Sequence, residues 1–132
     1  MSLALVTALA GGAGAVLRFV IDALVSQLFA RRAARRGQAP VTLPLGLLVV
    51  NMTGSFAIGV LAGVALQGGA AWSVIGVGVL GGCTTFSAAS LAAVQLLRQR
   101  RVGLACLVGA GQLFAAVLVA GAGLWVGRLL GG

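Results

Sequence analysis

The side chains that could bind a ligand or do chemistry in this chain are few, and most are uncharged. Asn51 and Ser55 are four positions apart in an apolar stretch, so on a helix they share one face. Thr53 points nearly the opposite way, because two residues advance about 200° around a helix. The Asn amide has two N–H donors that need partners in apolar surroundings. This pattern indicates neutral hydrogen-bond donors, which suit an anion.

A second set of candidate residues, one aromatic and two hydroxyl-bearing, lies about 30 residues further along the chain. Phe86, Ser87 and Ser90 share one face of a helix by i+3 and i+4 spacing. Interhelical hydrogen bonds, worth on the order of 0.6 kcal/mol each, equally explain an isolated Ser or Thr inside a membrane. For the serines this second interpretation stays open.

The groups that most enzymes and proton-coupled carriers need are absent from the sequence. It has no His and no Glu, and its single acid, Asp22, lies four residues after Arg18. That spacing predicts an ion pair near a membrane interface, and attraction of anions to a pore mouth is a second possible role for Arg18. Cys83 and Cys106 have no partners at metal-ligand spacing and are expected to be reduced thiols. We therefore expect that the protein is not an enzyme.

The composition is that of a membrane protein. Of the 132 residues, 61% are hydrophobic and only 8% are charged, and the mean hydropathy is +1.16. A soluble domain of this size would lack the polar residues to cover its surface. The nine basic residues are all Arg and give a net charge of +8. Because they cluster between apolar runs, they indicate loops at the anionic face of a bilayer and no nucleic-acid partner.

Four apolar runs are long enough to cross a bilayer, which takes about 20 residues as a helix. They cover approximately residues 3–29, 42–66, 72–97 and 104–130, separated by an Arg-rich loop over 30–41, a hairpin over 67–71 and an Arg-rich turn. Because these linkers are short, we predict an all-α membrane protein with a single four-helix transmembrane domain over residues 1–132.

Glycine is abundant, with 22 residues, and most of it is expected to serve helix packing. Gly59 and Gly63 in the second span, and Gly123 and Gly127 in the fourth, have the small-xxx-small spacing that lets helix backbones approach closely in lipid.

The third span has a different glycine pattern. Four glycines crowd its first half, and Gly81 and Gly82 are followed directly by Cys83-Thr84-Thr85. Glycine lowers the cost of leaving helical geometry, and a Thr is a serviceable N-cap for a new helix. We expect two half-helices that meet near mid-membrane, one to about Leu80 and one from about Thr85. A continuous helix with tolerated glycines is the alternative.

Three segments resemble the signature stretches of the CrcB/Fluc family of fluoride channels. They run from Gly11 to Phe19 (GGAGAVLRF), from Gly46 to Phe56 (GLLVVNMTGSF) and from Gly81 to Ser87 (GGCTTFS). The likeness extends over the whole chain in length, number of spans and order of motifs.

The resemblance implies an antiparallel dimer, of identical chains or with a homologous subunit, with two fluoride pores along the subunit interfaces. In such a pore Asn51 would donate to fluoride, and Phe86 would present the electropositive edge of its ring. Ser87 and Ser90 would belong to a polar track beside the pore. Pore-mouth or structural roles are open for Arg18, Ser55 and Thr85.

The resemblance also implies a structural sodium ion at the centre of the dimer, held by backbone carbonyl groups of Gly81 and Thr84. The chain departs from the family pattern nearby: the family usually has a second Phe at the position of Ala89 and a Thr at that of Ala88. The fourth span, which often supplies Ser hydroxyls, has Gln112 as its one clear hydrogen-bonding side chain.

We therefore expect a subunit of a fluoride-selective channel in the bacterial plasma or inner membrane, which exports fluoride from the cytoplasm by passive electrodiffusion. One alternative is a small four-helix drug or cation exporter, which would need a membrane-embedded Glu. The other is a non-transporting assembly subunit, which would explain the glycines but not Asn51.

The Arg distribution predicts an orientation. The loops after the first and third spans carry seven Arg, against one on the other side, Arg128. Since Lys and Arg in short loops favour the cytoplasmic side, both termini should face outward. A chain that inserts both ways would be expected to have a balanced count, so an oppositely oriented homologous partner is one explanation and an overridden bias in a homodimer is the other.

Overall fold

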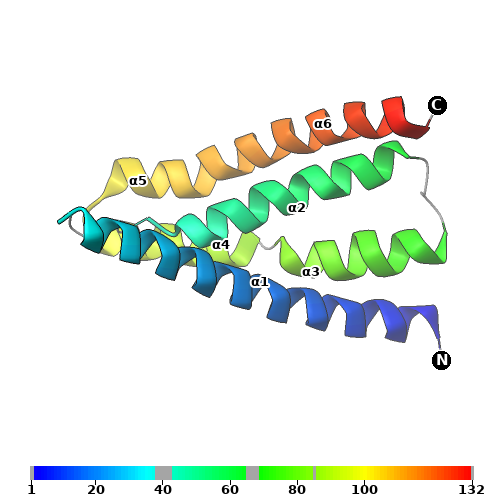
Figure 1. Ribbon diagram of the computed structural model, residues 1–132, viewed down its shortest axis with the longest axis horizontal. Helices are drawn as coiled ribbons and strands as arrows, with labels where there is room; N and C mark the ends of the chain where they lie inside the picture. The colour runs from blue at the N-terminus through cyan, green and yellow to red at the C-terminus, as the bar shows by residue number, and fades with distance from the viewer. Residues whose placement is uncertain (1, 38–42, 65–68, 85, 132) are drawn as a thin grey trace.

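The computed structural model describes residues 2–37, 43–64, 69–84 and 86–131, and nearly all of them are helical. In chain order the elements are α1 (Leu3–Arg35), α2 (Leu45–Gly63), the π-helix η1 (Trp72–Leu80), α3 (Gly81–Cys83), α4 (Phe86–Arg98), α5 (Val102–Cys106), the π-helix η2 (Leu107–Gly111) and α6 (Gln112–Gly131). They form an elongated bundle with both termini at one end (Figure 1).

The described residues contain four helical stretches that are long and apolar enough to span a membrane: Leu3–Arg35, Leu45–Gly63, Trp72–Arg98 and Val102–Gly131. The four spans expected from the sequence are thus confirmed, with shifted ends. Of the hairpin expected over 67–71, residues 67 and 68 lie outside the described residues, whereas residue 69 is a bend and residues 70–71 are already helical. Residues 38–42, in the linker after the first span, also lie outside the described residues.

The first helix extends further than expected, because residues 30–35 belong to α1 and not to a loop. Ala and Arg are both strong helix formers, and Arg32 and Arg35 favour the negative end of the helix dipole. The helix ends where Gly37 adopts a φ of 62°, a left-handed conformation that glycine takes without strain. Since α1 has 33 residues, its last turns extend beyond the length that a bilayer requires.

The glycine pairs of the second and fourth spans serve close helix packing, as their spacing predicted, and the structure shows that they pack against each other. A Cβ on Gly59 would collide with the carbonyl oxygen of Ala120, and a Cβ on Gly127 with that of Val60. Gly63 and Gly123 are equally close to the facing backbone. The principal neighbour of α2 is therefore α6. Direct contact between the two backbones at these glycines fixes the relative position of the two helices.

The third span changes neighbours along its length. Its first half, η1 and α3, packs on α1, where Gly14 meets the carbonyl oxygen of Val79 and Gly82 that of Gly11. Its second half, α4, packs on α5 and η2 around Leu96, Ala105 and Val108.

Between the two halves α3 ends at Cys83, Thr84 has an extended backbone (φ −92°, ψ 100°), and α4 begins at Phe86. The first half is thus helical three residues beyond the expected Leu80. Thr85, the expected start of the second half-helix, lies outside the described residues.

Candidate functional site

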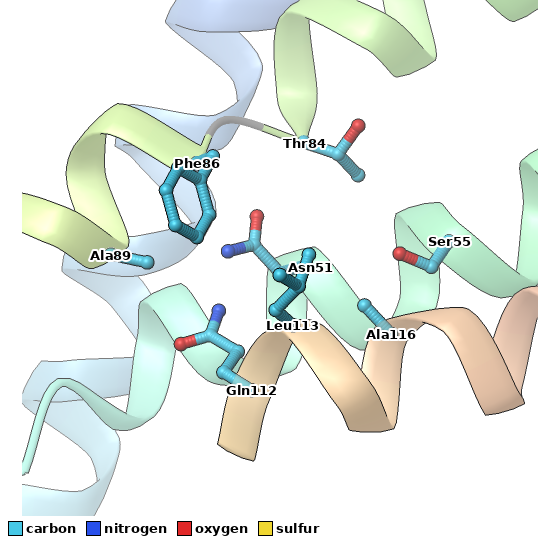
Figure 2. A pocket seen from close by; sticks show the side chains of 8 residues that line it. All are labelled: Asn51, Ser55, Thr84, Phe86, Ala89, Gln112, Leu113 and Ala116. Carbon is cyan, nitrogen blue, oxygen red and sulfur yellow. The ribbon is translucent and has the colours of Figure 1, made fainter. Parts of the chain in front are cut away.

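A pocket of about 150 Å³ opens beside the segment that joins α3 to α4. It is lined from α2, from Thr84 at the end of α3, from the first turn of α4 and from the first turns of α6 (Figure 2). Its lining residues are Asn51, Ser55, Thr84, Phe86, Ala89, Gln112, Leu113 and Ala116.

Asn51 is buried at the pocket wall, with 7% of its surface exposed. Its Oδ1 atom has no hydrogen-bond partner among the described residues, and its amide nitrogen points toward the Phe86 ring (Figure 2). Ser55, one turn further along α2, lines the same pocket. Thr53 is exposed elsewhere on α2 and donates to the carbonyl oxygens of Val49 (2.8 Å) and Val50 (3.2 Å). The structure confirms the prediction that Asn51 and Ser55 share one face of α2 and that Thr53 lies on another.

Phe86 starts α4, and its ring lies over the pocket with 59% of the residue exposed. One turn later, Ala89 is only 2% exposed and forms part of the wall. Ser87 and Ser90 do not line this pocket. Ser87 is exposed, and the Ser90 hydroxyl donates to the carbonyl oxygen of Phe86 at 2.9 Å. The structure therefore brings Asn51 and Phe86 together but not the two serines.

Gln112, which was not among the predicted site residues, also lines the pocket. The residue is 5% exposed, and its Nε2 atom has no hydrogen-bond partner among the described residues. Leaving such a buried donor unsatisfied costs about 1–3 kcal/mol. The available signal was an isolated amide in an otherwise apolar span, since intramembrane polar groups are generally functional.

Thr84 and Gly81 flank the end of α3. The Thr84 hydroxyl donates to the carbonyl oxygen of Leu80 at 2.9 Å, and its methyl group lies where Gly54 of α2 has no Cβ. At Gly81 a Cβ would meet only the carbonyl oxygen of Gly76, at 3.7 Å. Within this chain a Cβ at position 54 would displace the Thr84 methyl group, whereas a Cβ at position 81 would have room.

The predicted ion pair between Arg18 and Asp22 is wrong. Gly46 of α2 lies directly against the side chain and backbone of Asp22, so close helix packing holds this carboxylate beside α2. Its Oδ1 atom accepts a hydrogen bond from the Ser26 hydroxyl at 3.4 Å. The Nε atom of Arg18 is buried, without a partner among the described residues.

Both cysteines are free, as expected, with Cys83 buried and Cys106 exposed. The Cys83 thiol donates to the carbonyl oxygen of Gly14 at 3.1 Å, which ties α3 to α1. The described residues contain no group of three or more His, Cys, Asp or Glu side chains suited to a metal ion.

The described residues contain four apolar helical stretches long enough to span a membrane, and the second, third and fourth of them line a small pocket with amide and aromatic walls. Together these features define a multi-pass membrane protein with a candidate binding site for a small polar species. The family model described as "CrcB-like protein, Camphor Resistance (CrcB)" matches residues 5–124. The chain belongs to this CrcB/FluC family, so it is a membrane channel homologue and not an enzyme.

Relatives agree with this assignment over nearly the full length. The chain is 44% identical to "Fluoride-specific ion channel FluC 1" of Leifsonia xyli, over 95% of this chain and 86% of that protein. It is 41% identical to a "Fluoride-specific ion channel FluC" of Novosphingobium aromaticivorans, over 83% of each chain. For a protein of that name from Thermus thermophilus the identity is 37%, over 97% of each chain.

Proposed function

We propose that this protein is a subunit of a passive fluoride channel that lowers the fluoride concentration of the cytoplasm. The observation that carries the proposal is the buried Asn51 amide, which faces a pocket beneath an aromatic ring in a membrane-spanning chain. The relatives named as fluoride-specific channels support fluoride as the transported ion.

Fluoride is small and strongly hydrated, so a pore must replace its water with closely spaced donors. The Asn51 amide supplies N–H donors, and the edge of the Phe86 ring supplies partial positive charge. The chain has no His and no Glu, and its single acid, Asp22, does not line the pocket, so the pocket itself holds no group for proton coupling. Fluoride therefore moves down its electrochemical gradient, and the two rival functions, a drug exporter and an assembly subunit, find no support.

The pore is completed by a second subunit in an antiparallel dimer. Two observations support this proposal: Phe86 leaves 59% of its surface uncovered, and the single chain also exposes Phe114 and Trp125 on the fourth span. Lipid covers part of this apolar surface, and the partner covers the part beside the pocket. Ser87 and Ser90 then extend the polar track, with Ser55 inside the pocket, while Arg18 and Thr85 serve at the pore mouth or structurally.

The third helix is interrupted near mid-membrane, and a structural sodium ion sits at the interruption. The extended backbone of Thr84 supports this, because the end of a helix leaves carbonyl groups without intrahelical partners. The residues fit a cation with oxygen ligands, since backbone carbonyls of Gly81 and Thr84 need no carboxylate, and the open space at Gly81 permits approach by a partner. The ion would supply fixed positive charge between the two subunits.

Anomalous scattering tests the sodium proposal. Crystals soaked with a heavier monovalent cation should give one peak on the dimer axis, beside Gly81 and Thr84. The Gly81→Ala variant should still fold, because its Cβ has room within the chain. It should lose the peak, because the same Cβ would fill the open space through which the partner approaches. A peak that is unchanged in Gly81→Ala would contradict the assignment.

Cysteine labelling tests the orientation. Figure 1 shows the end of α1 and the turn between α4 and α5 at one end of the bundle, opposite the termini. With Cys83 and Cys106 replaced, Gln99→Cys should react only from the cytoplasmic side and Gly131→Cys only from outside, because seven Arg lie at the first end and one at the second. Equal labelling from both sides would show dual insertion and favour a homodimer. One-sided labelling would require an oppositely oriented homologous partner.

The proposed function itself is tested by reconstitution. Purified protein in liposomes loaded with potassium fluoride should release fluoride when an ionophore carries the potassium, as measured with a fluoride electrode. No release above protein-free liposomes, from this protein alone and from its complex with a homologous subunit, would contradict the channel. Release that requires a proton gradient would indicate a coupled carrier.

A further inference from the structure

We propose that the Arg-rich end of the bundle binds an acidic phospholipid, with its headgroup between α1 and α4 and part of an acyl chain between α2 and the fourth span. This proposal goes beyond the channel function and does not depend on it. The headgroup cavity shares no lining residue with the pocket beside Asn51.

The headgroup position is a cavity of about 310 Å³ that lies between α1, the residues just before α2 and the last turns of α4. Its polar lining residues are Ser26, Gln95 and Gln99. The Ser26 hydroxyl is engaged as a donor to Asp22. The two glutamines are exposed, and their amides carry four N–H donors between them. The cavity therefore presents neutral donors to an anionic group.

An apolar slot of about 60 Å³ adjoins this cavity, and Leu43 and Pro44 line both. All lining residues of the slot except Gln112 are apolar. Leu48 of α2 is 40% exposed and Leu107 of the fourth span 60%, so a lipid chain outside the bundle can reach the slot. Because α2 and the fourth span both run away from the Arg-rich end (Figure 1), the slot lies deeper in the membrane than the turn after α4. A phospholipid has the same order of parts, with a polar headgroup at the interface and acyl chains toward the bilayer centre.

The charge around the cavity favours an acidic headgroup. Seven exposed Arg residues belong to the end of α1, the end of α4 and the turn that follows α4: Arg31, Arg32, Arg35, Arg36, Arg98, Arg100 and Arg101. The single acid of the chain, Asp22, does not line the cavity, because it packs against Gly46 of α2. Guanidinium groups form strong, charge-assisted hydrogen bonds with phosphate.

The location of the cavity selects a lipid as the source of the phosphate. The orientation predicted from the Arg distribution places this end at the cytoplasmic leaflet, whose acidic lipids attract basic segments near the membrane. A zwitterionic lipid would leave the Arg charge unmatched, and a free phosphate would leave the apolar slot unused. An acidic phospholipid satisfies both parts of the site.

Thermal stability in a neutral detergent tests the proposal. Phosphatidylglycerol should raise the melting temperature of the wild-type protein by about 3 °C or more, because a ligand that binds only the folded state stabilises it. Phosphatidylcholine with the same acyl chains should leave the melting temperature unchanged, since it has no net charge. Glycerol 3-phosphate should also leave it unchanged, since it has the anion without the chains. Native mass spectrometry of the same samples should show phosphatidylglycerol retained on the protein.

Gln99→Glu is the matched variant. It places a negative charge at the cavity and should lose most of the shift that phosphatidylglycerol gives. Gln99 is exposed and follows the last residue of α4, so helix packing is preserved. Gln95→Glu repeats the test at a second residue of the cavity. The control, Arg128→Gln, lowers the net charge by the same amount at the opposite end of the bundle and should keep the full shift.

The outcomes are distinct. An equal shift with phosphatidylcholine would overturn the proposal, because the charge would not be recognised. An equal shift with glycerol 3-phosphate would overturn it in favour of a free-phosphate site. Equal losses in Gln99→Glu and Arg128→Gln would attribute the effect to net charge alone, and a full shift in both glutamate variants would remove the cavity from the site. The lipid comparisons use the wild-type protein, so they decide the question even where a glutamate variant fails to fold.

Discussion

Asn51→Asp is expected to abolish fluoride flux while the protein still folds. Asp is nearly isosteric with Asn, so the packing of α2 is preserved, but an ionised carboxylate offers only acceptors. At about 4 Å the repulsion between two unit negative charges is about 4 kcal/mol at an effective dielectric constant of 20, which corresponds to a rate loss of roughly a thousandfold. The measurement is the initial rate of fluoride release from liposomes at equal amounts of reconstituted protein.

Thr53→Val provides the matched control for Asn51→Asp. Thr53 lies two residues away on the same helix, but it is exposed, and its hydroxyl donates to backbone carbonyl groups of α2 itself. Its flux should equal that of the wild-type protein. Wild-type flux in Asn51→Asp at pH 7 would remove Asn51 from the pore, whereas equal losses in both variants would indicate damage to α2.

Gly123→Leu is expected to prevent correct folding of the bundle. A Cβ at this position would lie against the carbonyl oxygen of Phe56, and the backbone of a packed helix cannot yield as a side chain can. Overpacking of a core typically costs about 1–3 kcal/mol, and here it would push α6 away from α2. The expected result is a protein that aggregates in mild detergent or melts well below the wild-type protein.

The control for Gly123→Leu lies two residues earlier on the same helix. A Cβ on Gly121 would meet nothing within 4 Å, so Gly121→Leu should fold normally. It should even gain stability, since Leu favours a helix over Gly by about 1 kcal/mol. Size-exclusion profiles and melting curves of the two variants check both expectations, and similar losses in both would show that α2 and α6 do not pack as described.

Several features followed from the sequence because each depends on local spacing. Span length predicted the four helices, small-xxx-small spacing predicted that Gly59, Gly63, Gly123 and Gly127 serve close helix packing, and a four-residue interval placed Asn51 and Ser55 on one helix face. Each of these patterns operates within one or two turns of a helix, where the geometry is nearly invariant.

Other features depend on the rotation of each helix about its axis relative to its neighbours. The spacing of residues within one helix does not predict this rotation. Apart from Gln112 and Arg128 the fourth span is apolar on every side, so no amphipathic pattern indicated that Gln112 faces Asn51. Likewise, the spacing of Arg18 and Asp22 permitted an ion pair, but the close approach of Gly46 directs Asp22 toward α2. The roles of Phe86, Ser87 and Ser90 remain predictions.

The contact between α2 and α6 has a consequence for biosynthesis. Gly59 packs against α6, whose own glycines, Gly123 and Gly127, are synthesised about 60 residues later. At roughly 5–20 residues per second, several seconds pass between synthesis of the two faces. During that interval the glycine face of α2 is not covered by α6. A face with small-xxx-small spacing favours association with other helices in the membrane. Delayed synthesis of the last span would therefore lengthen the time in which α2 can associate with helices of other proteins. It would also lengthen the time in which membrane quality control can recognise the unpaired helix.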